Sequence, residues 1–145
     1  MANQQGNFGF RPVLMMGSAY NGQGQQEMTI ASNETNSIFM GDPVVLNANG
    51  SISRGSSAGA ELVGIFNGCF YTDPTTQKPT FSNHYPGAIV ADDIVANVIS
   101  DPDVIFEVKV DDTNGGRAQV GSTANIATYA TGSTKSGISG VALDG

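Results

Sequence analysis

The chain has 145 residues, the size of one ordinary domain, which excludes a large multidomain assembly. Charged residues make up only 13% and the formal net charge is −7, which disfavours binding to nucleic acid or to an anionic membrane surface. The polarity comes instead from neutral side chains and glycine, so charge-driven disorder and a long charged helix are excluded and β structure with many turns is favoured.

Residues 1–26 are dominated by Gln, Asn and Gly, with aromatic residues spaced through them and no helical period. We predict an extended N-terminal arm, which cannot form a core of its own and becomes ordered by lying across another surface. An arginine next to aromatic residues is suited to an interface, because it can bind a carboxylate and stack on a ring. The candidate contact residues of the arm are Phe8, Phe10, Arg11 and Tyr20.

Residues 27–145 are predicted to form one β-rich domain, because short apolar runs alternate there with turn residues. Asn49-Gly50 predicts a tight hairpin in which both residues adopt positive φ. The strands predicted in the first half of this domain are Met28–Ala31, Ser37–Met40, Val44–Leu46, Ser51–Arg54, Glu61–Phe66 and Gly68–Tyr71.

Residues 72–87 are predicted to be a long loop, and loops of this length often make contacts. The candidate contact residues there are Tyr71, Phe81 and Tyr85. Beyond the loop, β-branched residues favour a strand over a helix within 88–100, and alternation makes 104–110 the clearest strand. Two more strands are expected at 125–130 and 141–143. About eight short strands predict an all-β fold, a small antiparallel sandwich or barrel.

Catalytic chemistry is not expected, although residues 55–59 match the pattern of a nucleophile elbow. Ser57 would be the nucleophile and His84 the base, with Glu61 or Asp73 as the acid. An elbow needs a strand-to-helix turn in an α/β sheet, whereas both flanks here predict strands. We therefore predict a flexible loop and no enzymatic activity.

Metal and cofactor sites are not predicted either. Cys69 is the one cysteine and His84 the one histidine, so neither a disulfide within the chain nor a zinc site can form from them. Cys69 is expected to be a small buried core residue. The paired aspartates at 92–93, 101–103 and 111–112 lack the spacing of an EF-hand, so turn aspartates that bond local backbone amides are favoured over a calcium site.

Targeting signals are also not recognised in the sequence. No apolar run approaches the roughly 20 residues that span a bilayer, and residues 1–6 lack the features of a signal peptide. We expect synthesis in a reducing cytoplasm.

Five segments in succession resemble one known family. They are Phe8–Val13, Gly17–Gln23, Ile38–Val44, Val63–Gly68 and Asp101–Val108. In this order and at these distances they are similar to the structural cement, or capsid decoration, proteins of tailed phages. Members of that family extend beyond the point at which this chain ends, so either a short member or a further C-terminal segment is expected.

The resemblance implies a virion protein on the head exterior that joins neighbouring major capsid subunits after the head expands. Its implied fold is a small β-rich domain with extended arms. The expected partners are the major capsid protein and neighbouring copies of the chain. Deletion of residues 1–20 is expected to abolish head binding and to leave the domain folded. The alternative is a receptor-binding β module of a virion tail or fibre, although the absence of Trp makes carbohydrate stacking less suited.

Overall fold

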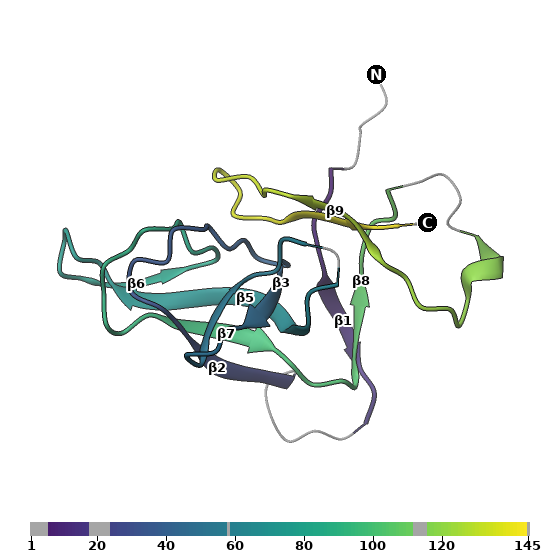
Figure 1. Ribbon diagram of the computed structural model, residues 1–145, viewed down its shortest axis with the longest axis horizontal. Coiled ribbons are helices and arrows are strands. Elements are labelled where there is room, and N and C mark those ends of the chain that lie inside the picture. The colour runs from purple at the N-terminus through teal and green to yellow at the C-terminus, as the bar shows by residue number, and fades with distance from the viewer. Residues whose placement is uncertain (1–5, 18–23, 58, 112–115, 145) are drawn as a thin grey trace.

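The computed structural model describes residues 6–17, 24–57, 59–111 and 116–144. Within them the chain is nearly all β, as predicted (Figure 1). No helix in these ranges has the length and apolar character needed to cross a membrane. The elements are β1 Arg11–Met15, β2 Gln25–Ile30, β3 Pro43–Leu46, β4 Ser51–Arg54, β5 Leu62–Thr72, β6 Pro79–Ser82, β7 Val95–Ile99, β8 Val104–Glu107, a 3-10 turn Arg117–Gln119, β9 Ile126–Ala130 and β10 Gly140–Leu143.

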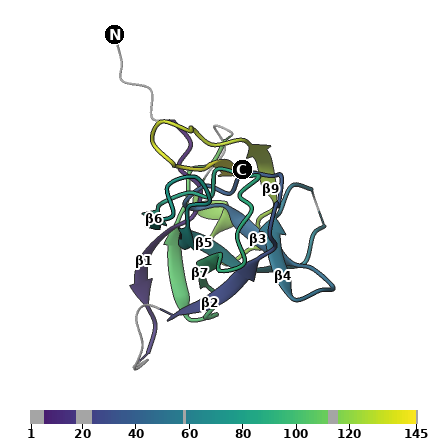
Figure 2. The same ribbon diagram turned by 90° about the vertical axis from the view of Figure 1, so that its left-hand side faces the viewer.

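A closed five-stranded barrel forms the centre of the molecule. The main sheet has the order β3-β4-β2-β7-β5-β6, and a further pairing of β3 with β5 closes its first five strands into a ring (Figure 2). Neighbouring strands are antiparallel except β2 and β4, which are parallel. Closure leaves β6 as an added edge strand, paired with β5 alone among the described strands. The prediction of a small barrel or sandwich is thus confirmed as a barrel.

The core fills the barrel interior with β-branched and aromatic side chains. Ile30, Ile52, Phe66 and Val98 come from four different barrel strands and are fully buried. Alternation along each strand places these residues on the inner face. Burying a side chain of this size stabilises the fold by about 1.5–3 kcal/mol.

The predicted hairpin between β3 and β4 is present, but its turn differs from the expected two-residue form. Gly50 N donates to Asn47 O at 3.0 Å, and only Gly50 of the pair Asn49-Gly50 has positive φ, at +82°. The side chain of Asn49 instead accepts hydrogen bonds from the backbone N and the hydroxyl of Ser51. The turn is therefore a longer one closed by glycine, a common three-residue hairpin geometry.

Three other predictions along the chain need correction. The two strands expected at 61–66 and 68–71 are one strand, β5, with a bulge near Gly68, whose φ is +107°. Residues 37–40 form only isolated bridges, because Ile38 pairs with Tyr85 and Met40 with Ile138. The expected loop at 72–87 contains β6, which folds back on β5 as a hairpin.

The described part of the predicted arm is extended, but it lies on its own domain. β1 pairs antiparallel with β8 in a separate two-stranded sheet, and Arg11 faces Glu107 in the register. β2 begins at Gln25, inside the segment predicted as arm. β8 ends at Glu107, short of the strand expected to continue to Val110.

A buried polar cluster fastens the C-terminal hairpin, β9 and β10, to the barrel. Asp42 is fully buried and accepts hydrogen bonds from Phe39 N at 2.9 Å and Ser139 Oγ at 2.5 Å. Arg54 Nε lies 3.2 Å from Asp42 Oδ2, although its N–H is not aligned for a hydrogen bond. The Arg54 guanidinium also donates to the carbonyls of Tyr129 and Ala130 on β9. The Asp42 carboxylate and the Arg54 guanidinium thereby hold the C-terminal hairpin against the barrel, although the two are distant in sequence.

Candidate functional site

The predicted arm contacts Phe8, Phe10 and Arg11 all take part in contacts within the chain. The Arg11 guanidinium lies 4.6 Å from the centre of the Phe8 ring, and its NH2 group is 3.1 Å from Glu107 Oε2. Phe10 packs edge-on against Phe106 with ring centres 6.1 Å apart. Arg11 thus binds a carboxylate and stacks on a ring as expected of its chemistry, but both partners belong to the same chain.

Phe8 and Phe10 line a cavity of about 330 Å³ between β1 and the barrel. Its other walls include Met40, Ile65 and Ile138. Both aromatic rings are half-buried, so they are directed toward their own domain. Tyr20, the fourth predicted arm contact, lies outside the described residues.

Two of the three predicted loop contacts are core residues, and this prediction is wrong for them. Tyr85 is 0% exposed, and its hydroxyl donates to Glu34 O and accepts from Ile89 N. Tyr71 is 5% exposed, and burial raises the pKa of both phenols. Both rings fill the core. The Tyr85 hydroxyl is not left unpaired there, because it forms hydrogen bonds with two backbone groups. Neither tyrosine can offer its side chain to a partner.

Phe81, the remaining loop contact, is 82% exposed on the edge strand β6. Its ring rests on Phe70 of β5, with ring centres 4.8 Å apart. An exposed aromatic side chain fixed by a neighbour is a suitable anchor for a partner, since little conformational freedom is lost on binding.

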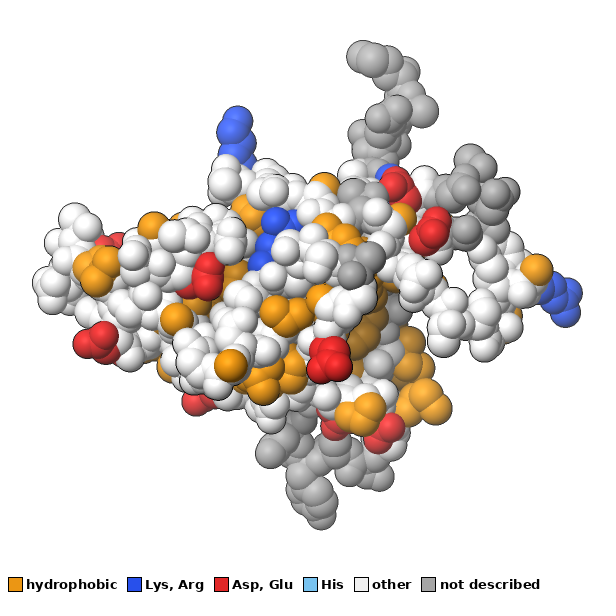
Figure 3. Space-filling view, viewed as in Figure 1, with side chains coloured by type: hydrophobic (Ala, Val, Ile, Leu, Met, Phe, Trp, Pro, Cys, Tyr) orange, Lys and Arg blue, Asp and Glu red, His pale blue; other side chains and the backbone are white. Residues whose placement is uncertain are grey.

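Among the described residues, the largest group of exposed apolar side chains on neighbouring strands lies on β1 with the adjoining Met16 and on β8. We name these residues, 11–16 and 104–107, the apolar ribbon. Val13, Leu14 and Met16 are each more than half exposed, and Ile105 is 39% exposed. Leu14 faces Ile105 directly across the two strands. Figure 3 shows hydrophobic side chains gathered at the lower right, where Figure 1 places the ribbon, with acidic side chains beside them.

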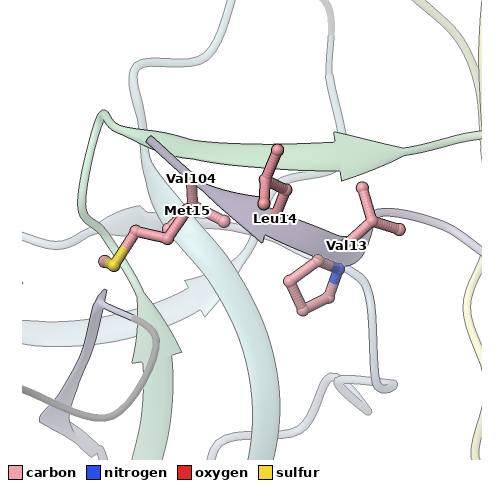
Figure 4. Close-up of a pocket in the computed structure, with 5 residues that line it drawn as sticks. Val13, Leu14, Met15 and Val104 are labelled. Carbon is pink, nitrogen blue, oxygen red and sulfur yellow. The ribbon is translucent and has the colours of Figure 1, made fainter. Parts of the chain in front are cut away.

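The ribbon also carries a hollow of about 260 Å³. Its lining residues are Pro12, Val13, Leu14, Met15 and Val104. Figure 4 shows Val13, Leu14 and Met15 projecting from β1, with Val104 contributed by β8. The register slips between Pro12 and Leu14, and such a bulge changes the direction in which side chains project. An exposed apolar patch with a hollow is typical of a protein-binding surface.

The residues weighed for catalysis lie in ordinary structural settings. Ser57 follows β4 and precedes β5, so the strand-to-helix turn of a nucleophile elbow is not formed at this position. His84 stacks on Phe39 with ring centres 5.5 Å apart, and its Nδ1 lies 3.1 Å from Asn83 Oδ1. Asp73 accepts hydrogen bonds from the backbone N of Thr75 and Thr76, as expected of a turn aspartate.

The described residues offer neither a cluster of metal ligands nor an exposed thiol. Among the described ranges no cluster of three or more His, Cys, Asp or Glu side chains is suited to hold a metal ion. Asp93 accepts three hydrogen bonds from Thr72, which hold the pKa of its carboxyl below the usual value. Cys69 is buried as predicted, its thiol contacts His84 O at 3.6 Å, and burial raises its pKa to about 12.

The sequence interpretation missed the residues that make the ribbon apolar. Val13–Met16 is an uninterrupted apolar run within an otherwise polar segment, and this signal was available. Ile105 lies in the strand predicted at 104–110, but its exposure depends on the pairing of β8 with β1. The buried pair Asp42 and Arg54 carried no local signal.

Comparisons with protein-family models, with curated proteins and with solved structures each found no match to this chain.

Proposed function

We propose that this chain is a virion structural protein that binds the exterior of the expanded head of a tailed phage and cements neighbouring major capsid subunits. The observation that carries the proposal is the apolar ribbon, which presents Val13, Leu14, Met16 and Ile105 to solvent beside a closed barrel. The succession of segments that resembles the cement family supplies the class of partner. A concentrated patch of exposed apolar surface is the feature expected of a protein that binds another protein and catalyses no reaction.

The exposure of the ribbon changes our expectation of which arm residues contact the capsid. Phe8 and Phe10 face their own barrel, so the contacts pass to Val13, Leu14 and Met16 on the outer side. Because β1 is already held as a strand by β8, binding does not have to order a free segment. Preorganisation of this kind lowers the entropic cost of association.

A second exposed anchor would allow one molecule to join two subunits. Phe81 lies on β6, at the far left of Figure 1, while the ribbon lies to the right of the barrel. We assign the Phe81 contact to a second capsid subunit or to a neighbouring copy of the chain. Each contact alone can be weak, since many copies act together on one lattice and stabilise the state to which they bind.

The experiment is co-sedimentation of the full chain with expanded, undecorated heads, with bound copies counted against the major capsid protein. We expect saturation at one copy per capsid subunit or a simple fraction of it. Leu14→Asp should abolish binding, since it places a charge in the ribbon at a side chain that is already 60% exposed. The matched control is Val120→Asp, a change of the same kind at an 83% exposed residue outside the ribbon, which should bind normally.

Three outcomes would contradict the proposal. They are no binding of the wild-type chain to heads, binding without a fixed ratio, and equal binding by the Leu14 and Val120 variants. Recovery of a few copies on tails instead of heads would favour the receptor-binding alternative. Point substitution is preferred to deletion of residues 1–20, because deletion would also remove β1 and leave β8 unpaired.

A further inference from the structure

Two carboxylates lie at one end of the apolar ribbon, in the turn that leads from β7 into β8. Asp103 O accepts a hydrogen bond from Met16 N at 2.8 Å, which places this turn directly against the end of the exposed apolar run. Asp103 N in turn donates to Asp101 Oδ1 at 2.8 Å, so the two aspartates form one fixed unit. Asp101, Met15 and Val104 also converge on the backbone of Gly24.

The charge at this end of the ribbon is unbalanced. Neither Asp101 nor Asp103 has an ion-pair partner in the part of the chain that the structure describes. At the other end Arg11 is paired with Glu107 at 3.1 Å, and Lys109 follows two residues later. The exposed apolar side chains are therefore bordered by net negative charge on the side of Met16.

We propose that the ribbon binds a protein surface whose exposed apolar side chains are flanked by Lys or Arg side chains, and that these cations meet Asp101 and Asp103. This inference rests on the proposed function and states the chemistry that the capsid surface must have. Apolar burial supplies most of the affinity but has no direction, whereas the carboxylates fix orientation and speed up encounter.

The same charges argue against other occupants of the ribbon. An anionic membrane or a nucleic acid would be repelled by the aspartates and by a net charge of −7. A second copy of this chain docked two-fold by the same face, with the ribbons parallel, would bring Asp101 and Asp103 of both copies together. With the ribbons antiparallel, these aspartates would meet an end at which Arg11 is already paired with Glu107. A basic rim on a different protein satisfies both the apolar and the charged parts of the surface.

The test measures association rates of the full chain with expanded, undecorated heads over a range of salt concentrations. Replacing Asp101 and Asp103 together by Asn keeps the acceptor for the Asp103 amide and removes two charges. We expect association at low salt to slow about 10-fold and the salt dependence to flatten, because steering of this kind raises on-rates by 10-fold or more. Wild-type and variant rates should converge at high salt.

The matched control is the double variant Glu34→Gln with Asp92→Asn, which makes the same change in net charge on loops outside both the ribbon and the β5–β6 hairpin. It should keep wild-type rates within about 2-fold, since those residues are far from the ribbon. Replacing Asp101 and Asp103 by Lys should abolish association by repulsion. Urea unfolding of every variant shows whether the fold is retained, so that a loss of binding is assigned to the surface and not to unfolding.

Different failures separate the inference from the proposed function. If the wild-type chain binds heads but the Asp101/Asp103 variants match the control in rate and salt dependence, the charged rim is refuted and the cement function stands. If the wild-type chain binds no heads at any salt concentration, both are refuted. Binding of the wild-type chain to vesicles of phosphatidylcholine with phosphatidylserine would overturn the assignment of a protein partner.

Discussion

Two arginines of this chain form ion pairs of nearly equal length but opposite burial, which makes a matched pair of substitutions. Arg54 Nε lies 3.2 Å from Asp42 Oδ2, with side chains 11% and 0% exposed. Arg11 NH2 lies 3.1 Å from Glu107 Oε2, with side chains 60% and 54% exposed. We predict that Arg54→Met strongly destabilises the fold and that Arg11→Met hardly changes it.

The magnitude follows from what each substitution leaves behind. Without Arg54 the Asp42 carboxylate keeps its hydrogen bonds from Phe39 N and Ser139 Oγ but loses the only cation in contact with it among the described residues. Two carbonyls of β9 also lose their donors. Breaking a buried pair in this way costs about 3–5 kcal/mol. Loss of an exposed pair costs at most about 1 kcal/mol.

The loss at Arg54 should also depend on pH. Burial raises the pKa of Asp42, against the opposing effects of its hydrogen bonds and of Arg54. Removing Arg54 raises that pKa further, so the native state of the variant binds the proton more tightly than the unfolded chain does. The stability from this group is fully present below the ordinary aspartate pKa of about 4 and is lost as the pH rises through the folded-state value. The deficit of Arg54→Met therefore shrinks on acidification.

The assay is urea unfolding followed by far-ultraviolet circular dichroism from about pH 4 to pH 8, since the chain has no Trp. The midpoint of Arg54→Met should fall strongly at pH 7 and fall less near pH 4, where the loss of the donors to the β9 carbonyls remains. Equal losses for the two arginine variants, or a deficit at Arg54 that is independent of pH, would refute this account of the buried cluster.

Three further predictions concern the barrel. Cys69, with a pKa of about 12, should not react with a thiolate-specific reagent at pH 8 while the protein is folded; rapid labelling of the native state would contradict its burial. Phe66→Ala should lower the free energy of unfolding by about 3–5 kcal/mol, because the ring is fully buried. Phe81→Ala should lower it by less than about 0.5 kcal/mol, because that ring is 82% exposed. Similar urea midpoints for the two variants would contradict this difference in burial. Gly64→Ala should cost roughly 1–3 kcal/mol in the same assay, because its Cβ would lie 2.5 Å from Ile99 O; an unchanged midpoint would contradict the close approach of β5 and β7.

Local sequence signals predicted the elements better than their pairing. Alternation and β-branched residues located β3, β7 and β9, and Gly50 located the hairpin. The bulge that lets β5 continue through Gly68 has no distinct local signal, because a glycine there is equally typical of a break between two strands.

The surface was harder to predict than the fold, because exposure depends on contacts between distant residues. Tyr85 follows no periodic pattern, yet its hydroxyl satisfies backbone groups at Glu34 and Ile89 and its ring fills the core. The apolar run at 13–16 can be recognised in the sequence. Its exposure to solvent, however, depends on the pairing of β1 with β8, in which Arg11 and Glu107 are partners 96 residues apart. A single sequence does not contain that pairing.

The pairing of β1 with β8 has a consequence for how the protein is made. β1 leaves the ribosome before β8, and Glu107 follows its partner Arg11 by 96 residues. At typical elongation rates this gap lasts roughly 5–20 s. The closed barrel, from β2 to β7, can form during that interval, because all of its strands precede β8 in the chain. Val13–Met16 meanwhile remains an unpaired apolar segment on the nascent chain, which makes it a site for chaperone binding until β8 is synthesised and the apolar ribbon forms.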